Sequence, residues 1–574
     1  AILAALLRHG QVSADELLTL PERDRPLAMQ RFLAAHPEPS LTGEDAPPRI
    51  VPQRADLLAA LARQWDAWLG AKGVPEAGPA AARLVEQLCG LLGLAPLESR
   101  AYGAAHGYMV SAPPLRLSLP ARFPILLVAE PDLTAQGLRD AHDLARALGA
   151  TSFFAVLLTP APRAAALTQI RTLRREPDLA AHSPVVLDRT DLAHLCLAKD
   201  PLGLFAQMIL AQLDLPSVSP YVAAGPVPES MFFGREQEVA DILRTIRESS
   251  HIIVGARKMG KSSLLAQLGR LMETTEGLAP VRLDCQHITS YAGFFDALEM
   301  GLQVQLPSRE PEGLHTAALH WRQRQPNTCV VLLLDEVDHL VQYDQGQGMR
   351  LFDVLRALDR ARAWRCVLCG ERVLYRAVHD PTLSLAGLGQ LTRLGPLRPQ
   401  AVQRMVEAPM AAMGVTLTDG SQLVRDLVAL SAGRPDVVQA ACQMMIARAH
   451  ARGERTLALA DLAAVRQSDE FREFYLDAVW GNASTLERLI TVLMAEQERF
   501  DAPAVAAALA RAERPTTLRL VRESMDTLDL YAILERDGGG YRFAATALPQ
   551  MLMEAGLLAG LRQGLVDSLP SKGV

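Results

Sequence analysis

The stretch from His251 to Leu265, HIIVGARKMGKSSLL, decides the fold of this chain. Its opening residues predict a short strand, Gly255 to Gly260 form a loop bounded by glycines, and Lys261 begins a helix. The spacing fits G-x-x-x-x-G-K-[ST], a phosphate-binding loop in which successive backbone N–H groups point at an anion. Small residues let the backbone approach that anion, and the following helix adds the partial positive charge of its N-terminus.

Lysine usage supports this interpretation. The chain has only five lysines, and Lys258 and Lys261 are two of them. We expect the ammonium of Lys261 to reach the β- and γ-phosphates and the hydroxyl of Ser262 to bind Mg²⁺. The residues expected to surround the phosphates are Gly255, Ala256, Arg257, Lys258, Met259, Gly260, Lys261, Ser262 and Ser263.

A second motif follows about seventy residues later in CVVLLLDEVDH, Cys329 to His339. A continuous apolar run of this length suits a parallel strand that is covered on both faces. Asp335 and Glu336 then emerge at its carboxyl end, where open α/β sheets place their ligands. We expect Asp335 to hold Mg²⁺, and Glu336 to orient and deprotonate the attacking water.

The composition describes a large globular chain. Its 574 residues are 49% apolar and 21% charged, and the formal net charge is −6. One hydrophobic core cannot serve a chain of this length, so we expect several domains. The small negative charge does not indicate nucleic-acid binding, which would need a local basic patch. We expect no membrane span, because no apolar run approaches the roughly 18 residues required.

Cysteine usage favours a cytoplasmic protein. The seven cysteines are scattered, and the C-x-x-C of Cys366 and Cys369 falls in a strand-like run without a second pair of ligands, so we expect no zinc site. Dispersed, odd-numbered thiols fit a reducing compartment. The chain starts at Ala1 without Met and shows no signal-peptide layout.

The first 212 residues predict two regions. Residues 1–115 are rich in alanine and leucine at helical spacing, which predicts a helical region without catalytic motifs. Residues 116–212 predict a small α/β domain, because apolar strand-like runs alternate with helical stretches. These runs are FPILLVAE (Phe123–Glu130), SFFAVLLT (Ser152–Thr159) and SPVVLD (Ser183–Asp188).

Acids follow two of these strands, Glu130 and Asp132 after the first and Asp188 and Asp191 after the last. A nuclease would need a nearby lysine, but no E-x-K follows the second strand; a phosphoacceptor domain would need one too, and only Lys199 is available. Acids at strand ends commonly cap helices. We therefore favour a non-catalytic sensor or docking domain, with a nuclease effector as the alternative.

A proline-rich stretch at residues 213–231 has no periodicity and predicts a semi-rigid linker. It leads into FFGREQEVADIL, whose F-x-G-R-E box shortly before a phosphate-binding loop resembles the lead-in of AAA+ and STAND ATPases, including origin-recognition-type loaders. In those families this box helps to form the adenine side of the pocket. The resemblance therefore implies base-side roles for Phe233, Gly234 and Arg235.

The resemblance covers roughly residues 232–554 and implies ATP and Mg²⁺ as cofactors. It implies an α/β fold class, with a P-loop NTPase core, a helical lid and a winged helix, which we expect to follow the small α/β domain and the N-terminal helical region. The implied parts are the ATPase core at 232–400, the lid at 401–470, the winged helix at 471–554 and a tail at 555–574.

Two further site residues follow from the family pattern. The strand WRCVLCG corresponds to one that in STAND proteins often ends in an arginine near the γ-phosphate, so Arg372 is the candidate sensor, with a surface arginine as the alternative. The segment SAGRPDVVQAAC contains the G-x-P of STAND lids, which implies that Pro435 packs near the nucleotide. In loaders the same helix carries an arginine, a part that Arg434 could play.

The C-terminal region predicts three helices, Ser484–Met494, Ala502–Ala510 and Thr516–Leu528, followed by a hairpin at Tyr531–Phe543. This order resembles a winged helix, whose third helix can enter a major groove. Winged helices in STAND proteins also serve as internal packing modules, and several acids dilute the basic patch. The candidate DNA contacts are Arg514, Thr516, Thr517, Arg519, Arg522 and Arg542.

Two functions are consistent with these motifs. The first is a slow ATPase switch of STAND or AAA+ type that couples a signal to a conformational change, alone or as a homo-oligomer; bacterial stress or antiviral defence is the setting that the resemblance implies. The second is a DNA-binding AAA+ loader or transcription regulator. A purely structural pseudo-ATPase is disfavoured, because Lys261, Ser262, Asp335 and Glu336 are all present.

Overall fold

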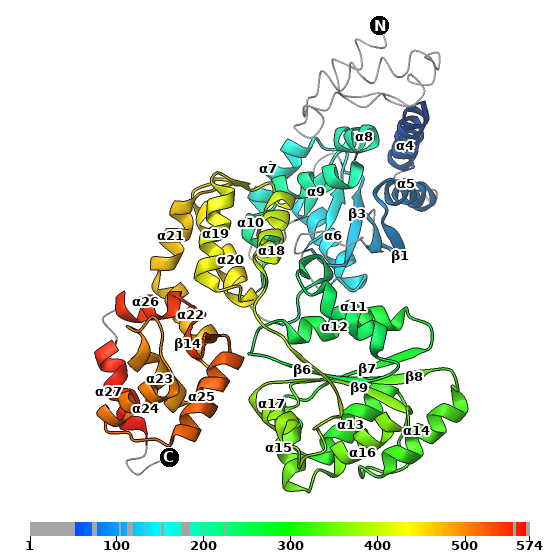
Figure 1. The fold of residues 1–574 in the computed structure, drawn as a ribbon. Helices are drawn as coiled ribbons and strands as arrows, with labels where there is room; N and C mark the ends of the chain where they lie inside the picture. Colours follow the sequence, from blue (N-terminus) through cyan, green and yellow to red (C-terminus); the bar gives the residue numbers. More distant parts are fainter. Residues whose placement is uncertain are drawn as a thin grey trace. The chain divides into compact units, whose positions relative to one another are not determined.

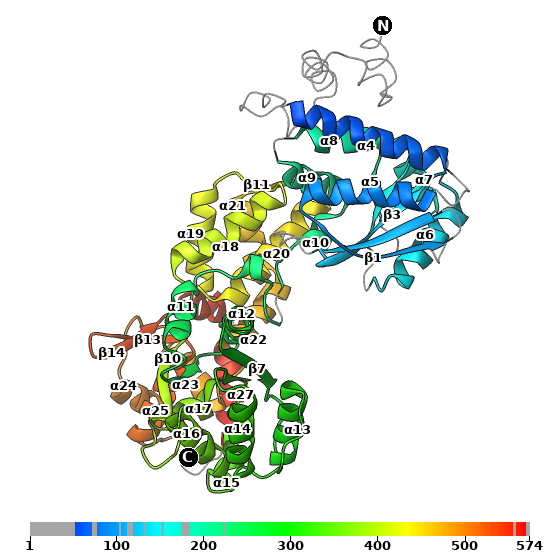
Figure 2. The same cartoon turned by 90° about the vertical axis from the view of Figure 1, so that its right-hand side faces the viewer.

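The computed structural model describes residues 52–71, 77–102, 105–111, 119–130, 133–150, 154–173, 184–198, 200–222, 225–554 and 558–569. The chain divides into two compact units. One contains Ala1–Ser219 with the short segment Ala412–Gly414, and the other contains Pro220–Ala411 with Val415–Val574. Both are shown in Figure 1 and, turned by 90°, in Figure 2.

The first unit is built on a five-stranded mixed sheet in the order β1-β2-β3-β4-β5, in which β1, β2 and β3 are antiparallel neighbours and β3, β4 and β5 are parallel. Its strands are β1 (Ala95–Tyr102), β2 (Ala105–Ser111), β3 (Arg122–Val128), β4 (Val156–Leu158) and β5 (Val185–Leu187). Its helices are α4 (Pro52–Gly70), α5 (Ala77–Leu92), α6 (Ala135–Ala147), α7 (Arg163–Leu173), α8 (Arg189–Leu197), α9 (Pro201–Gln212) and α10 (Leu215–Val218).

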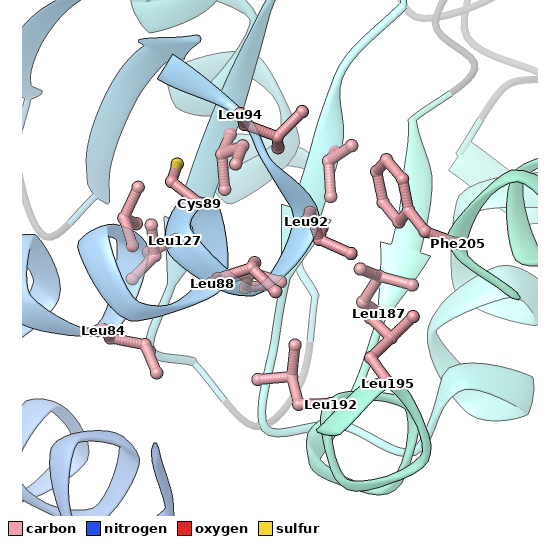
Figure 3. Packing of buried hydrophobic residues seen from close by; sticks show 14 of the residues in the cluster. Leu84, Leu88, Cys89, Leu92, Leu94, Leu127, Leu187, Leu192, Leu195 and Phe205 are labelled. Atoms are coloured by element: carbon pink, nitrogen blue, oxygen red, sulfur yellow. The ribbon is translucent and has the colours of Figure 1, made fainter. Parts of the chain in front are cut away.

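Helices cover both faces of this sheet, as the alternation along β3 requires. Ile125 and Leu127 belong to one buried cluster with α4, α5, α8 and α9, part of which is shown in Figure 3. Leu126 and Val128 belong to a second cluster with α6 and α7. The three predicted strands of this region are therefore confirmed.

The prediction of a purely helical region up to residue 115 was wrong for residues 95–102 and 105–111, which form β1 and β2. β1 is an edge strand whose residues 95–101 are all exposed, so it has no buried face to produce a period of two in the sequence. A bulge between Pro96 and Glu98 interrupts its pairing with β2 further.

The acids after β5 cap a helix. Asp188 is the N-cap of α8 and forms a capping box with Asp191, whose carboxylate also pairs with Arg163 at 2.5 Å. Across the described residues, no group of three or more His, Cys, Asp or Glu side chains is arranged to hold a metal ion, so nothing there supports the nuclease alternative. Asp132 and Lys199 lie outside the described residues.

The second unit contains a five-stranded parallel sheet in the order β10-β6-β9-β8-β7. The strands are β6 (Ser250–Val254), β7 (Leu278–Asp284), β8 (Cys329–Asp335), β9 (Trp364–Gly370) and β10 (Gly389–Arg393). The helices of this α/β core are α11 (Glu236–Thr245), α12 (Lys261–Glu273), α13 (Tyr291–Leu302), α14 (Gly313–Arg324), α15 (Asp338–Gly346), α16 (Arg350–Arg360) and α17 (Arg372–His379).

Helices α11 and α12 lie on one face of the sheet, while α13, α14 and α16 lie on the other (Figure 1). Val331 and Leu333 of β8 pack into the cluster formed with α11 and α12, and every residue of β8 from Val330 to Asp335 is buried. This burial on both faces confirms the interpretation of the continuous apolar run as a core strand.

A group of helices follows the sheet. Its elements are α18 (Pro399–Ala412), α19 (Gly420–Ser431), α20 (Pro435–Ala451), α21 (Leu459–Gln467) and α22 (Asp469–Trp480), with a short bridge between β11 (Thr416–Leu417) and β12 (Thr456–Leu457). We call the helices α18 to α22 the lid helices.

The C-terminal module, residues 484–554, has the element order predicted for a winged helix. It contains α23 (Thr485–Met494), α24 (Ala502–Arg511), α25 (Leu518–Leu530), the antiparallel hairpin of β13 (Leu534–Asp537) and β14 (Gly540–Phe543), and α26 (Ala547–Glu554). Helix α27 (Leu558–Ser568) follows it. Within the described part of the chain, no helix is both long enough and apolar enough to cross a bilayer.

Part of the predicted linker is anchored to the lid helices. The 3₁₀ turn η1 (Glu229–Met231) precedes the core. Before it, the buried hydroxyl of Tyr221 donates to the carbonyls of Met405 (3.2 Å) and Val406 (3.0 Å) in α18. The N–H of Val222 donates to Oε1 of Gln439 in α20 at 3.0 Å. These bonds fix a segment that the sequence predicted to be only a spacer.

Candidate nucleotide site

The carboxyl edge of the parallel sheet brings the predicted motifs together. Val254 at the end of β6 is in register with Gly370 at the end of β9, and Asp284 of β7 is in register with Asp335 of β8. The loop after β6, the acids after β8 and the start of α17 after β9 therefore leave the sheet at one edge, which is where open α/β sheets bind ligands.

The backbone of the phosphate-binding loop requires glycine at two positions. Gly255 donates its N–H to the carbonyl of Gly370 at 3.4 Å, and a Cβ at this position would lie 2.5 Å from the carbonyl oxygen of Leu394. Gly260 has φ of 93° and directly precedes α12. It therefore occupies the left-handed region that favours glycine. No acidic residue lies in the first turn of α12 itself.

Lys261 is buried, and its ammonium is fully engaged. Nζ donates to the carbonyls of Gly255 (3.1 Å) and Ala256 (3.0 Å), and to Oε1 of Glu371 at 3.3 Å. An ammonium has three donors. Any phosphate that it is to bind must replace at least one of these partners.

The two acids after β8 have different surroundings. Asp335 is buried, which raises the pKa of its carboxyl, although the hydrogen bond with Ser262 and the charge of Lys261 oppose the shift. Burial raises the pKa of Glu336 to about 7, and the negative charges of Glu371, Asp335 and Asp338 act in the same direction against that of Lys261. Glu336 also has φ of 50°, a strained conformation of a kind that concentrates at functional sites.

Asp338, which the sequence analysis did not single out, fixes the start of α17. Its carboxylate accepts hydrogen bonds from the N–H groups of Glu371 (2.6 Å), Val373 (2.7 Å) and Leu374 (3.3 Å). A Cβ on Gly370 would lie 2.4 Å from Oδ2 of Asp338, so the glycine leaves room for this carboxylate. The second aspartate of DEVD is thus a helix cap rather than a ligand-facing group.

These elements surround a cavity of about 350 Å³. The predicted residues that line it are Phe233, Arg235, Arg257, Lys258, Met259, Gly260, Lys261, Ser262, Ser263, Asp335, Glu336 and Pro435. Gly234, Gly255, Ala256 and Arg372, which were also predicted as site residues, are not part of the lining.

The residues of the lead-in box pack against neighbouring parts of the core and α18, in addition to lining the cavity. Arg235 is buried, and its guanidinium donates to the carbonyls of Gly395 and, at 3.4 Å, Met259, so it braces the phosphate-binding loop. Gly234 has φ of 74°, and a Cβ there would lie 2.3 Å from Cβ of Ala401 in α18. Its place in the box is explained by close packing of the chain against this helix.

Arg372 points to the C-terminal module. Its Nη2 lies 2.9 Å from Oε2 of Glu487 and 3.0 Å from the carbonyl of Asn482, and its guanidinium lies over the ring of Tyr531 at 5.6 Å. The preceding residue, Glu371, is the one that faces Lys261. Sequence spacing alone could not distinguish these neighbours, because their directions depend on how α17 begins.

Arg434 connects the loop, the lid helices and the C-terminal module. This buried guanidinium donates to the carbonyls of Arg257 (3.3 Å), Ala478 (2.7 Å) and Tyr531 (3.2 Å). In addition, Nζ of Lys258 lies 5.2 Å above the ring of Phe474 in α22. The loop that would hold phosphates is thus in direct contact with the helices that follow the core.

Several lining residues were not predicted. They come from the connection before the core, from β7 and the residues after it, from the segment between β10 and α18, and from the lid helices. They are Val222, Gly225, Pro226, Val227, Met231, Phe232, Arg282, Asp284, Gln286, Leu397, Met405, Asp436 and Gln439. The acid at the end of β7 was visible in PVRLDC, but only the strand order shows that it neighbours Asp335.

The residues around Asp335 fit Mg²⁺. A carboxylate and a hydroxyl, contributed by Asp335 and Ser262, already lie within hydrogen-bonding reach of each other. Magnesium prefers such oxygen ligands and commonly takes its remaining ones from water and substrate phosphates. A site of this kind does not require three carboxylates, and such a cluster is absent from the described residues.

Comparisons with known proteins agree with these motifs. Residues 225–470 match the model of the family described as novel STAND NTPase 1. A search of curated proteins found no match.

Several solved structures show distant likeness. The ORC2 protein of Aeropyrum pernix is 14% identical with a TM-score of 0.43, over 58% of this chain and 95% of that one. The Walker-type ATPase PABY2304 of Pyrococcus abyssi is 14% identical with a TM-score of 0.42, over 58% and 99%. Cdc6p from Pyrobaculum aerophilum is 15% identical with a TM-score of 0.31, over 61% and 97%.

Replacing Lys261 with alanine should weaken ATP binding by at least about 100-fold, because removing one partner of a buried charge contact costs roughly 3 kcal/mol. Calorimetric titration with Mg²⁺ and ATP measures the change. Arg270→Ala, at the exposed end of the same helix, is the matched control and should bind normally. Wild-type affinity in Lys261→Ala would contradict the assignment of the loop.

Replacing Asp338 with alanine should lower the free energy of unfolding by about 1–3 kcal/mol, because the N–H groups at the start of α17 lose their acceptor. Urea denaturation followed by circular dichroism measures the loss. Glu273→Ala, at an exposed position in α12, serves as the control. Equal stability of the two variants would show that the cap contributes nothing.

Proposed function

We propose that residues 225–470, which match the model of the novel STAND NTPase 1 family, bind ATP with Mg²⁺ and hydrolyse it slowly as a molecular switch. The observation that carries the proposal is the single cavity in which Lys261, Ser262, Asp335 and Glu336 meet. The loop and the start of α12 supply donors for phosphates, and the acids supply ligands for a cation and a base for water.

The chain's own residues would divide the work as follows. Lys261 and the backbone of the loop bind and orient the β- and γ-phosphates. Ser262 and Asp335 hold the Mg²⁺, which neutralises charge on the phosphates when bound. Glu336 accepts a proton from the attacking water, and its raised pKa suits a carboxyl that takes up a proton near neutral pH.

Coupling between the pocket and the C-terminal module supports a switch rather than a simple hydrolase. Arg434 bonds to the loop, to α22 and to Tyr531, while Arg372 and Arg393 hold Glu487 and Asp529 of the C-terminal module. A ligand that prefers one arrangement of these contacts shifts the population toward it. The C-terminal module would then act as an internal restraint on the ATPase.

DNA binding by the C-terminal module is the second candidate, and exposure is the observation that favours it. Arg519 on α25 is 89% exposed, and Arg542 on the hairpin is 56% exposed. However, Arg519 pairs with Glu523, Arg542 pairs with Glu535, and Arg514 donates to the carbonyl of Val566. Thr516 bonds to a nearby carbonyl and Thr517 caps α25. The local acids lower the positive potential of this patch.

The cellular role of the protein is proposed from its match to a STAND NTPase family. The first unit, without a described metal cluster, fits a sensor or docking role that receives the signal. We propose further that the protein is cytoplasmic, that it works alone or as a homo-oligomer, and that it acts in bacterial stress or antiviral defence. Size-exclusion chromatography with and without ATP tests the oligomeric part.

Glu336→Gln should keep ATP affinity and lose at least about 100-fold in turnover, because a general base contributes roughly that much to the rate. Single-turnover hydrolysis and calorimetry measure the two quantities. The trapped ATP state should also change the protease sensitivity of the C-terminal module, which Lys261→Ala with ATP should not do. Unchanged turnover would remove Glu336 as the base.

If the C-terminal module is an internal restraint, the protein should form no complex with duplex DNA at moderate salt. Fluorescence polarisation across a salt series measures this, since phosphate contacts give a steep salt dependence. The paired variant Arg519→Ala with Arg522→Ala provides the comparison. A steep slope that this variant abolishes would instead establish the DNA-binding alternative.

A further inference from the structure

We propose that Glu371 is a resident anion that holds the ammonium of Lys261 when no nucleotide is bound, and that it must lose this partner before the terminal phosphates can bind. The inference rests on the proposed nucleotide-binding function and adds a residue that sets affinity and release. It makes Glu371 a positioning residue, because it acts through Lys261.

The contact is a buried ion pair between the start of α12 and the start of α17. Nζ of Lys261 and Oε1 of Glu371 are 3.3 Å apart, and the two side chains are 2% and 16% exposed. Among the described residues, this is the only hydrogen bond made by the carboxylate of Glu371. Little water is available to replace Lys261 when the pair separates, so separation leaves a poorly solvated charge.

The backbone of Glu371 cannot readily follow the lysine. Its N–H donates to Asp338 at 2.6 Å, and the preceding Gly370 ends the buried strand β9. The next residue, Arg372, is held by Glu487 of the C-terminal module. The carboxylate therefore stays near its present place while the flexible lysine side chain extends toward the phosphates.

Phosphate and Glu371 compete for the same cation. Both are anions, and Glu336 and Asp335 already place negative charge nearby. A di- or triphosphate that binds this ammonium therefore competes with the carboxylate of Glu371 and then lies near its negative charge. The expected result is weaker binding, and faster release, than the loop would give if Glu371 were neutral.

This arrangement suits a switch that must exchange its nucleotide. When product leaves, Glu371 recaptures the ammonium and stabilises the empty loop, which lowers the barrier to release. If release limits turnover, removing the carboxylate lowers kcat and KM together, whereas simple damage to the pocket raises KM.

The test compares wild type with Glu371→Gln, which keeps the shape and removes the charge. Calorimetry with Mg²⁺ and ATP or ADP should show roughly tenfold tighter binding, the effect of about one charge-assisted contact. Stopped-flow displacement should show correspondingly slower release. AMP, whose single phosphate does not reach the position of Lys261, should bind both proteins equally.

Two further variants sharpen the comparison. Glu371→Asp keeps the charge but shortens the side chain by one methylene, so its affinity should lie between those of wild type and Glu371→Gln. Glu312→Gln removes an exposed carboxylate that pairs with Arg350 and should match wild type for all three nucleotides.

The outcomes separate the inference from the function on which it rests. Unchanged or weaker ATP binding in Glu371→Gln, beside a wild type that binds ATP, overturns the inference alone. An equal gain for AMP also overturns it, because the effect would not act through the lysine. Failure of both proteins to bind ATP at millimolar concentration overturns the proposed function and the inference together.

Discussion

The parallel register of β6, β9 and β8 is the constraint on which the candidate site depends. Because these strands run in the same direction, the loop of Lys261, the acid pair Asp335-Glu336 and Glu371 all leave the sheet at one edge, where Glu371 contacts Lys261. Each group alone is ordinary. Burial of these side chains strengthens the electrostatic interactions among one ammonium and three carboxylates.

The spacing of residues along the sequence was enough to predict those elements whose characteristic residues lie close together in the chain. The loop before Lys261, the strand ending at Asp335, and the three helices and hairpin of the C-terminal module all appear where their patterns indicated. Such patterns are readable because glycine, lysine and apolar residues carry local backbone and burial requirements. The α/β class of the core followed from the same signals.

The sequence was insufficient wherever direction or distant pairing decides the outcome. Whether Glu371 or Arg372 faces the loop depends on how Asp338 caps α17, a contact across 33 residues. The exposed edge strand β1 gave no alternating pattern, so it was mistaken for helix. Arg235 fulfils the family pattern in position, yet its guanidinium braces carbonyls of the core.

Tyr221 links the segment before the α/β core to helix α18. Its hydroxyl is bound to two carbonyls of α18, and Val222 and Val227 beyond it line the cavity. A displacement of α18 would therefore pull on the backbone at Tyr221 and Val222 and change the shape of the cavity wall that Val222 forms.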